Sequence, residues 1–374
     1  MTLGLTTFTG HATDIDITTA ILNDSVCLDN CTVDVNNPIV ISTANRQLFG
    51  VNDSKIQFVN GANVGKAEGM IYINANNIEV YSLRLDGNRE GNTQYRSGGD
   101  YQNLIEAHNC KNLWIHDCYL TNNHDDALEA TSCQNLNYSF NTIYMCGHDG
   151  LYAIDCKYVL AENNTIWTRI NSGLRLYNTN DALLRNNKIQ RGIGGGAGIE
   201  IQKWGSDDPM NNITVFNNEL RGLALPGIWI FGSQTYQTND AHIFIFNNTI
   251  IDCPTAMVVN GFNVNATNNN LVNNEIYLRN MYEYLPTATG FIFATDDTAV
   301  VHNELPTQYS VVLIDVSEEP VVPEEPVVPE EPVVPEEPVV PEEPIPVVEK
   351  KSSGGSGFFI DDVPQEPEPE PEPV

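Results

Sequence analysis

Carboxylate and imidazole side chains recur at a fixed step in the middle of the sequence, where they could transfer protons. Asp126 and Asp149 occupy equivalent places in two consecutive repeats, and Asp125 and His148 directly precede them. Two carboxyl groups held close together repel each other's charge, so one of them keeps its proton to a higher pH. A proton donor beside a carboxylate is what hydrolysis of a glycosidic bond requires. We expect these four residues to be catalytic, with Asp125 and Asp126 as alternatives because consecutive residues can face opposite ways.

Further polar and aromatic side chains follow at the same step, and together they are typical of a groove that binds a polysaccharide. Arginine and lysine can hold a uronate or sulfate group, and flat aromatic rings can stack on sugar faces. The pattern therefore predicts an extended acidic polysaccharide as the partner. The expected substrate-binding residues are Glu129, Tyr152, Arg175, Tyr177, Glu200, Gln202, Lys203, Trp204 and Trp229.

Each of these residues, taken singly, also has a structural explanation. Asp, Asn and His before glycine commonly form turns by bonding their own backbone, and Arg175 and Glu200 can form an ion pair between coils. The gathering of acids, histidines, cations and aromatic rings on one face nevertheless favours a binding or catalytic site. His116 and Asp117 lie outside this pattern, and we expect them to be turn residues.

The candidate residues come from six segments that align so that each column has one chemical character. Two columns, two places apart, are always apolar, which at the strand period of two means that both point into a core. The residue before the first apolar column is always Gly or Ala, which suits a bend with little room for a side chain. The segments are DALEAT (126–131), DGLYAI (149–154), SGLRLY (172–177), AGIEIQ (197–202), PGIWIF (226–231) and TAMVVN (255–260).

This repeat predicts an all-β fold, a single-stranded right-handed parallel β-helix of the pectin-lyase-like kind. The steps from 126 to 149 and from 149 to 172 are equal, and the later ones are slightly longer. A repeat of this length with strand periodicity is typical of such a solenoid. We expect one β-helix from about residue 30 to 300, with the six segments in one sheet.

A ladder of asparagines follows the same step. Stacked asparagines at a turn can bond to the backbone and to each other, which suits a coiled solenoid. The members of the ladder are Asn141, Asn164, Asn187, Asn218 and Asn248.

Cysteines also repeat at the coil step. Cys110, Cys133 and Cys156 are expected to stack as a core column rather than to bind a metal. Cys27 and Cys31 are close enough in sequence for a local disulfide. The sequence indicates no cofactor and no metal site; a structural calcium ion is compatible with it but not indicated.

Composition divides the chain into three parts. Residues 1–316 are the expected β-helix domain, with about 1–50 forming an N-terminal cap and first coil. Residues 317–349 repeat EEPVVP, and proline at every third place favours an extended polyproline spacer. Residues 350–374 are expected to be a disordered acidic tail.

Charge and hydropathy narrow the possible partners. Residues 318–374 hold 17 acids and two lysines, about half of the net charge of −31, so the β-helix part is also acidic. An acidic surface argues against nucleic acid, and no apolar run is long enough to span a bilayer. The first residues lack the basic and apolar regions of a signal peptide. We expect an extracellular, cell-envelope or virion-surface location, and a homotrimer if the protein is a spike.

Several motifs in order resemble the disaggregatase-related β-helix proteins of methanogenic archaea. The resemblance covers roughly residues 50–262 and implies degradation of the uronate-containing matrix that holds such cells together. The functional positions that it implies are His148, Asp149, Tyr152, Arg175, Glu200 and Gln202. The motifs are LRLDGNREGN (83–92), NLIEAHNCKNLWIHDCYL (103–120), CGHDGLYAI (146–154), NSGLRLYN (171–178), AGIEIQ (197–202) and PGIWIFG (226–232).

A looser similarity connects the chain to polygalacturonases, whose Asp-Asp, Gly-His-Gly and Arg-x-Lys elements lie on successive coils. Asp125-Asp126 and Gly147-His148 match two of these elements, but Asp149 replaces the second glycine. Tyr177 stands where the third element has its lysine, so Lys203 would have to supply that cation.

Three functions from different classes compete at this stage. The first is a glycan-cleaving enzyme, a hydrolase before a lyase, in which Tyr152, Arg175, His148 or Lys203 would serve the lyase reaction. The second is a non-catalytic glycan-binding adhesin, and the third is a structural spike or envelope protein. Sequence alone names neither the sugar nor the stereochemical course.

Overall fold

The protein is described by a computed structural model. It covers residues 4–293, apart from 66–67, 96–101, 193, 195, 204–210, 233–242, 260–263, 268, 275, 281–286 and 290–291. The predicted ligand Trp204, the proline-rich spacer and the acidic tail therefore lie outside the described residues.

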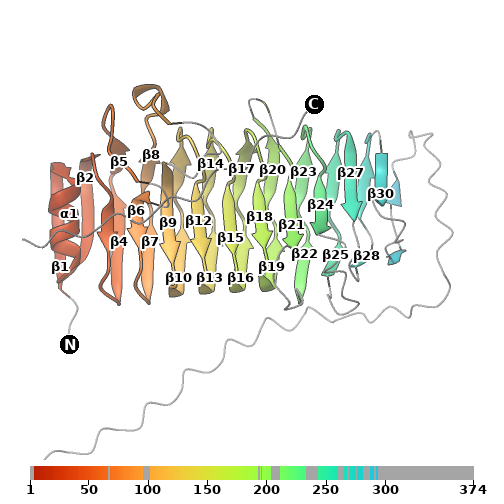
Figure 1. The fold of residues 1–374 in the computed structure, drawn as a ribbon, viewed down its shortest axis with the longest axis horizontal. Coiled ribbons are helices and arrows are strands. Elements are labelled where there is room, and N and C mark those ends of the chain that lie inside the picture. The colour runs from red at the N-terminus through yellow and green to blue at the C-terminus, as the bar shows by residue number, and fades with distance from the viewer. Residues whose placement is uncertain are drawn as a thin grey trace, which may run out of the picture. The chain divides into compact units, whose positions relative to one another are not determined.

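The chain winds into stacked coils, and most coils contribute three short strands (Figure 1). One strand of each coil belongs to a ten-stranded parallel sheet, which carries the six aligned segments as β12, β15, β18, β21, β24 and β27. The expectation of a parallel β-helix with these segments in one sheet is confirmed. The ten strands are β3 (Ile39–Ile41), β6 (Gly69–Ile73), β9 (Asn103–His108), β12 (Leu128–Thr131), β15 (Leu151–Ile154), β18 (Leu174–Tyr177), β21 (Ile199–Lys203), β24 (Ile228–Gly232), β27 (Thr255–Val259) and β30 (Ile276–Asn280).

The other two strands of each coil form two rows of a larger, 22-stranded sheet, which the long strands β1 (Leu5–Thr13) and β2 (Ser25–Val35) join at the N-terminal end. The first row holds β4 (Arg46–Val51), β7 (Ile78–Tyr81), β10 (Lys111–His116), β13 (Gln134–Ser139), β16 (Lys157–Glu162), β19 (Asn180–Arg185), β22 (Ile213–Phe216), β25 (Ile243–Phe246), β28 (Val264–Thr267) and β31 (Thr287–Thr289). The second row holds β5 (Lys55–Phe58), β8 (Arg84–Asp86), β11 (Tyr119–Thr121), β14 (Thr142–Tyr144), β17 (Thr165–Thr168), β20 (Lys188–Arg191), β23 (Glu219–Arg221), β26 (Thr249–Ile251), β29 (Asn270–Val272) and β32 (Ile292–Phe293).

The register of the ten-stranded sheet matches the sequence columns. Tyr152 pairs with Glu129 on one side and with Arg175 on the other, so equivalent positions of successive segments lie side by side. The side chains of the first apolar column, from Leu128 to Met257, are all fully buried. The strand period of two therefore separates an apolar interior from polar outward columns.

Close backbone approach explains the small residue that precedes the first apolar column. A Cβ atom placed on Gly150 would lie 2.4 Å from the carbonyl oxygen of Gly173 on the next coil. Real Cβ atoms do not approach an oxygen so closely, so a side chain at this bend would push the coils apart.

The asparagine ladder forms as expected and continues through Asn269. Asn164 Oδ1 accepts hydrogen bonds from the backbone N–H of Asn141, at 2.9 Å, and from its side-chain amide, at 3.1 Å. Asn164 Nδ2 donates in turn to the carbonyl oxygen of Tyr138. Each buried amide thus forms hydrogen bonds with backbone N–H and C=O groups at a turn, where those groups have no partner in a sheet.

The cysteine column is also a core feature. Cys110, Cys133 and Cys156 are buried free thiols, and the backbone N–H of Cys133 donates to Cys156 Sγ. The local disulfide expected between Cys27 and Cys31 is wrong, because both thiols are free. These two residues lie within β2, where an extended backbone holds them apart.

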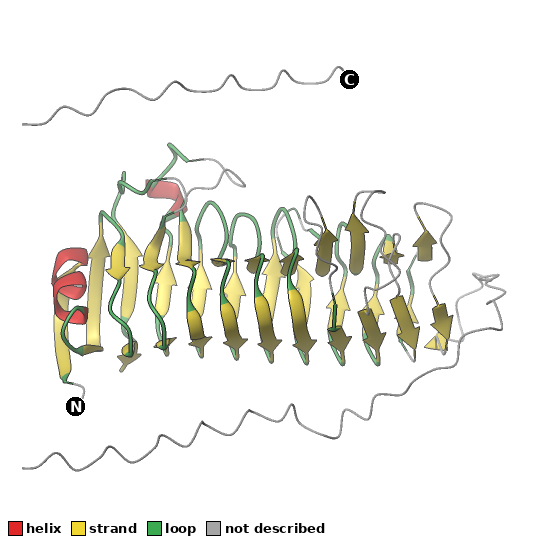
Figure 2. Cartoon of the chain, turned by 60° about the horizontal axis from the view of Figure 1, so that its bottom comes forward, coloured by secondary structure: helices red, strands yellow, loops and turns green. Residues whose placement is uncertain are grey.

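A helix covers the N-terminal end of the coil stack (Figure 2). Helix α1 (Asp14–Ile21) begins at a capping box, in which Thr13 and Asp16 bond each other's backbone N–H groups. Its Ile17 and Ile21 side chains are fully buried. The short 3₁₀ helix η1 (Arg89–Gly91) lies in the loop after β8. Among the described residues, no helix is both long enough and apolar enough to cross a membrane.

Replacing Leu151 by Asp should unfold the β-helix, because a buried carboxylate without a partner costs at least about 3 kcal/mol. Circular dichroism and urea unfolding measure the effect. Ile154→Asp is the matched control, since Ile154 lies on the same strand with a partly exposed side chain. Equal stability of the two variants would contradict the assignment of inward and outward columns.

Candidate active site

The candidate acids belong to a ladder at the N-terminal ends of four neighbouring strands of the ten-stranded sheet, β9, β12, β15 and β18. Asn103 Oδ1 accepts the backbone N–H of Asp126, and Asp126 Oδ1 accepts that of Asp149 at 2.6 Å. Asp149 Oδ1 accepts the backbone N–H of Ser172, also at 2.6 Å. The side chains at this position therefore link one coil to the next as well as forming the site.

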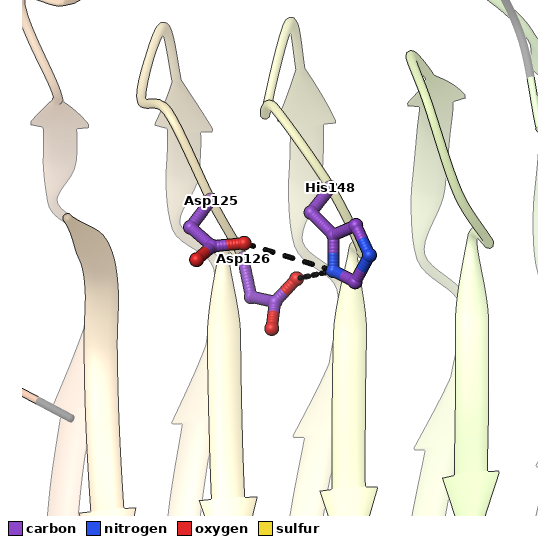
Figure 3. A group of neighbouring side chains, drawn as sticks. All are labelled: Asp125, Asp126 and His148. Carbon is purple, nitrogen blue, oxygen red and sulfur yellow. Dashed lines mark hydrogen bonds and ion pairs between the residues drawn. The ribbon is translucent and has the colours of Figure 1, made fainter. Parts of the chain in front are cut away.

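Three carboxylates surround one nitrogen of His148. Nδ1 of His148 lies 2.9 Å from Asp126 Oδ1, 3.2 Å from Asp149 Oδ2 and 3.6 Å from Asp125 Oδ1. Figure 3 shows that Asp125 and Asp126 both point toward the imidazole. The direction of the side chains therefore does not decide which of the two is catalytic. The His148 side chain is 21% exposed, whereas Asp126 and Asp149 are 1% and 0% exposed.

Burial and mutual repulsion distribute the protons in this cluster. Burial raises the pKa of Asp126 well above its usual value, and the charge of Asp149 raises it further. Burial alone would lower the pKa of His148, but the carboxylates of Asp149 and Asp126 outweigh that effect and raise it to about 11. At neutral pH the imidazole is therefore a cation, and Asp126 holds its proton to a higher pH than an ordinary carboxyl group does.

Arg175 connects this cluster to the next coil. Its guanidinium lies 3.4 Å from Asp149 Oδ2, 3.3 Å from Glu200 Oε1 and 2.7 Å from Gln202 Oε1. The same group stacks over the Tyr152 ring at 4.3 Å, a cation–π contact. Burial alone would lower the pKa of Arg175, but Asp149 and Glu200 raise it, so it remains a cation.

Glu200 is a second acid with a perturbed proton affinity. Its carboxylate is buried and accepts a hydrogen bond from Ser172 Oγ. Burial raises the pKa of Glu200, with Arg175 opposing and Asp149 adding to the effect. The cluster thus continues from the His148 acids to Glu200 through Ser172 and Arg175.

The remaining predicted substrate-binding residues differ in their contacts and in their exposure. Tyr177 lies edge-on to Tyr152 at 6.3 Å, and Trp229 follows Glu200 in the same outward column. Glu129 lies one coil before Tyr152 and accepts a hydrogen bond from Asn103. Lys203 is only 3% exposed, so its ammonium group does not face a polymer on the surface as expected.

Glu106 is a neighbouring acid that the sequence columns omitted. It pairs with Glu129 across β9 and β12, is fully buried, and contacts His108 and the side-chain amide of Asn103. The hydrogen bond that His108 donates to Glu106 raises the pKa of His108. The segment NLIEAH (103–108) has the same apolar register one coil before DALEAT, so extending the alignment by one repeat would have found this acid.

The donor atoms of Asp125, Asp126 and His148 lie within 4.8 Å of one another, a spacing that a divalent cation can bridge. Asp126 Oδ1 is already occupied by the backbone N–H of Asp149 and by His148 Nδ1. An ion bound through Oδ1 would displace one of these hydrogen bonds, and His148 Nδ1 already pairs with the carboxylates, so the cluster is described as an ion-paired acid group.

Family models match two overlapping parts of the sequence. Residues 69–243 match the right handed beta helix region, and residues 210–301 match the disaggregatase related family. The chain contains a right-handed β-helix with a disaggregatase-related region. The expected resemblance to disaggregatase-related β-helix proteins is confirmed, although the disaggregatase-related match includes only the last of the motifs noted above, at 226–232. No curated protein matches the sequence.

Solved β-helix structures show weak similarity over most of the chain. An exopolygalacturonase from Thermotoga maritima is 11% identical over 78% of this chain and 93% of its own, with a TM-score of 0.49. The catalytic domain of a GH87 alpha-1,3-glucanase is 11% identical over 79% and 68%, with a TM-score of 0.45. The A-module of the mannuronan C-5 epimerase AlgE4 from Azotobacter vinelandii is 14% identical over 76% and 92%, with a TM-score of 0.40. Similarity at this level assigns no reaction to the chain.

The raised pKa of His148 predicts a fall in stability at alkaline pH. The folded state holds the imidazole proton to about pH 11, against an ordinary pKa of 6.5. This contribution is fully present below pH 6.5 and is lost as the pH rises toward 11. Urea unfolding over that range should show a steeper loss for the parent than for His148→Gln. His11→Gln is the control, since His11 forms only an exposed ion pair; an identical slope for parent and His148→Gln would contradict the prediction.

Proposed function

We propose that the protein is a glycoside hydrolase that cleaves a uronate-containing polysaccharide at the Asp125, Asp126, His148 and Asp149 cluster. One observation carries the proposal: two positions of a structural ladder hold buried carboxylates where an amide would serve. Asn103 performs the same backbone contact as an amide, and Ser172 ends the ladder as a hydroxyl residue. Burying a charge costs several kcal/mol more than burying an amide, so Asp126 and Asp149 have a role beyond the hydrogen bond.

Proton affinities support a division of labour between the two acids. Asp126 holds a proton to higher pH than an ordinary carboxyl and is the proposed proton donor to the glycosidic oxygen. Its Oδ1 takes the ladder hydrogen bond from Asp149 and the hydrogen bond with His148, which leaves Oδ2 for the proton. Asp149, beside the cations of His148 and Arg175, is the proposed base or nucleophile. Asp125 is the proposed third acid, acting on the charge of His148.

The same chemistry makes a lyase less suitable at this site. A lyase needs a base that removes a proton next to a uronate carboxylate. Burial raises the pKa of Tyr152, which makes its phenolate less accessible, and His148 is already protonated at neutral pH. Neither residue is prepared to accept a proton, whereas the carboxyl cluster can both give and take one.

The proposed substrate follows from Arg175 and the rings beside it. The Arg175 side chain is 15% exposed, so its guanidinium is open to a ligand carboxylate on the outer face of the sheet. Tyr152, Tyr177 and Trp229 supply aromatic surface along successive coils, as a polymer requires. Activity on a matrix polysaccharide also fits an extracellular, cell-envelope or virion-surface location, which we propose together with it.

Asp126→Asn and Asp149→Asn should each lower turnover by ~10²–10⁴-fold while the fold persists. The amide oxygen still accepts the backbone N–H of the next coil, but the titrating proton is gone. Reducing-end release from acidic matrix polysaccharides measures turnover, with absorbance of unsaturated uronate read in parallel. Asp117→Asn is the control, because Asp117 is exposed and lies on the larger sheet.

The outcomes of this assay separate the competing functions. Full activity of both variants would overturn the proposed site, and unsaturated product would indicate a lyase. A parent that binds glycan without cleaving it would be an adhesin.

Arg175→Ala should weaken binding of acidic oligosaccharides by about tenfold or more and leave neutral ones nearly unchanged, because a charge-assisted bond to a carboxylate is lost. Isothermal titration with oligogalacturonate and a neutral oligosaccharide of equal length measures both affinities. Arg185→Ala is the matched control, since Arg185 forms a comparable ion pair with Glu162 on the larger sheet. Equal weakening in the two arginine variants would contradict a specific uronate contact.

A further inference from the structure

A hollow of about 500 Å³ opens on the first row of the larger sheet, at the N-terminal ends of β4, β7, β10 and β13. Gln47, Glu79, Trp114 and Asn137 are successive outward residues of these strands and line it. None of its lining residues belongs to the candidate active site. Its volume lies in the range of small-molecule sites.

Trp114 is presented to the hollow on a rigid support. Its ring stacks on the His116 imidazole at 4.0 Å, and its indole N–H donates to Ser139 Oγ at 3.1 Å. His116 stacks in turn on Tyr81 at 5.0 Å, and carboxylates of Glu79 and Asp117 hold its two nitrogens. His116 is thus the end of a strand and part of a stack, not the turn residue expected from sequence. The indole remains 41% exposed on this support.

A row of amides borders the exposed indole. Asn77, Asn112 and Asn135 each donate one side-chain hydrogen bond to the asparagine of the preceding coil, at 2.7–2.8 Å, the first acceptor being Asn45. Every amide of this row keeps a second N–H for another acceptor. Asn137 Oδ1 is buried and accepts no hydrogen bond within the described structure. The asparagine row therefore offers the hollow several donors that the fold does not use.

The charged side chains of the hollow already have hydrogen-bond partners within the fold. The Arg46 guanidinium donates to four backbone carbonyls, those of Ile21 and Leu22 at 2.9 and 3.0 Å among them. The Glu79 carboxylate accepts from Gln47 and from His116. Among the described lining residues, a ligand therefore meets amides and an aromatic face but no available cation, on a chain whose net charge is −31. Acidic ligands are disfavoured here, unlike at Arg175.

We propose that this hollow is a second glycan-binding site, specific for an uncharged polysaccharide segment that stacks a sugar face on Trp114 and bonds its hydroxyls to the asparagine row. An indole face matches the apolar C–H face of a pyranose ring, and amides match its hydroxyl groups. The site is independent of the chemistry at His148, and it would hold the chain on a mixed matrix while acidic segments are processed elsewhere. The alternative occupant of the hollow is a second copy of this chain, and the experiment must distinguish it from a glycan.

Native affinity electrophoresis in gels that contain glucans, mannans or galactans, with polygalacturonate as the acidic comparison, tests the proposal. The parent should be retarded by at least one neutral polysaccharide. Trp114→Ala should weaken that affinity by at least about tenfold, and Trp114→Phe should restore part of it because an aromatic face is kept. Retardation by polygalacturonate should not change in either variant.

Two controls make the result specific. Tyr144→Ala removes a ring that is also 41% exposed but lies on β14, outside the hollow, and should behave as the parent. Arg175→Ala should keep neutral binding, so failure of the proposed catalytic site would leave this result intact. The proposal is overturned if no neutral polysaccharide retards the parent, or if Trp114→Ala binds equally well. A change of oligomeric state in Trp114→Ala, seen by light scattering without a change in glycan affinity, would identify a protein contact instead and also overturn it.

Discussion

Hydrogen bonding between equivalent positions of successive coils is the constraint on which the rest of this structure depends. Once Glu129, Tyr152, Arg175 and Glu200 are paired in register, each side chain has the neighbour that the repeat length assigns to it. A parallel strand ladder fixes these neighbours about 4.8 Å apart. Side chains that are a whole coil apart in sequence therefore become nearest neighbours on the surface, and an outward column can hold a binding site without disturbing the core.

The residues that point into the core could be predicted from the sequence because their pattern repeats from coil to coil. Features that occur in only one coil could not be predicted in this way. The apolar columns and the asparagine ladder each recur in several coils, and the structure follows them. The Cys27 and Cys31 interpretation relied on sequence distance, but an extended strand separates residues that a turn would bring together. Lys203 was placed correctly on its strand, yet its burial depends on surrounding side chains that no column describes. His116 likewise acquires its role from rings on other coils.

The electrostatic interactions of the acid cluster depend on side chains of several stacked coils and not on those of a single coil alone. Asp126 belongs to one coil, His148 and Asp149 to the next, and Arg175 to the one after that. In water these charges would interact weakly, but burial removes the solvent that would screen them. Burial is also the main cause of the raised pKa of Asp126; the charge of Asp149 adds to it, and the hydrogen bond with His148 opposes it. Residue types and coil spacing can be read from the repeat, whereas the proton distribution depends on burial.

Substitution within a structural ladder is how this fold combines stability with chemistry. The ladder runs from Asn103 through Asp126 and Asp149 to Ser172, and each of the first three side chains accepts the backbone N–H of the next member. The contact requires only an acceptor oxygen, so the residue type is free to vary between amide and carboxylate. Charge appears at the two middle positions, where His148 and Arg175 can compensate it. A solenoid can therefore place reactive groups at coil junctions while each coil remains bonded to the next, and departures from an otherwise regular ladder are where its function should be sought.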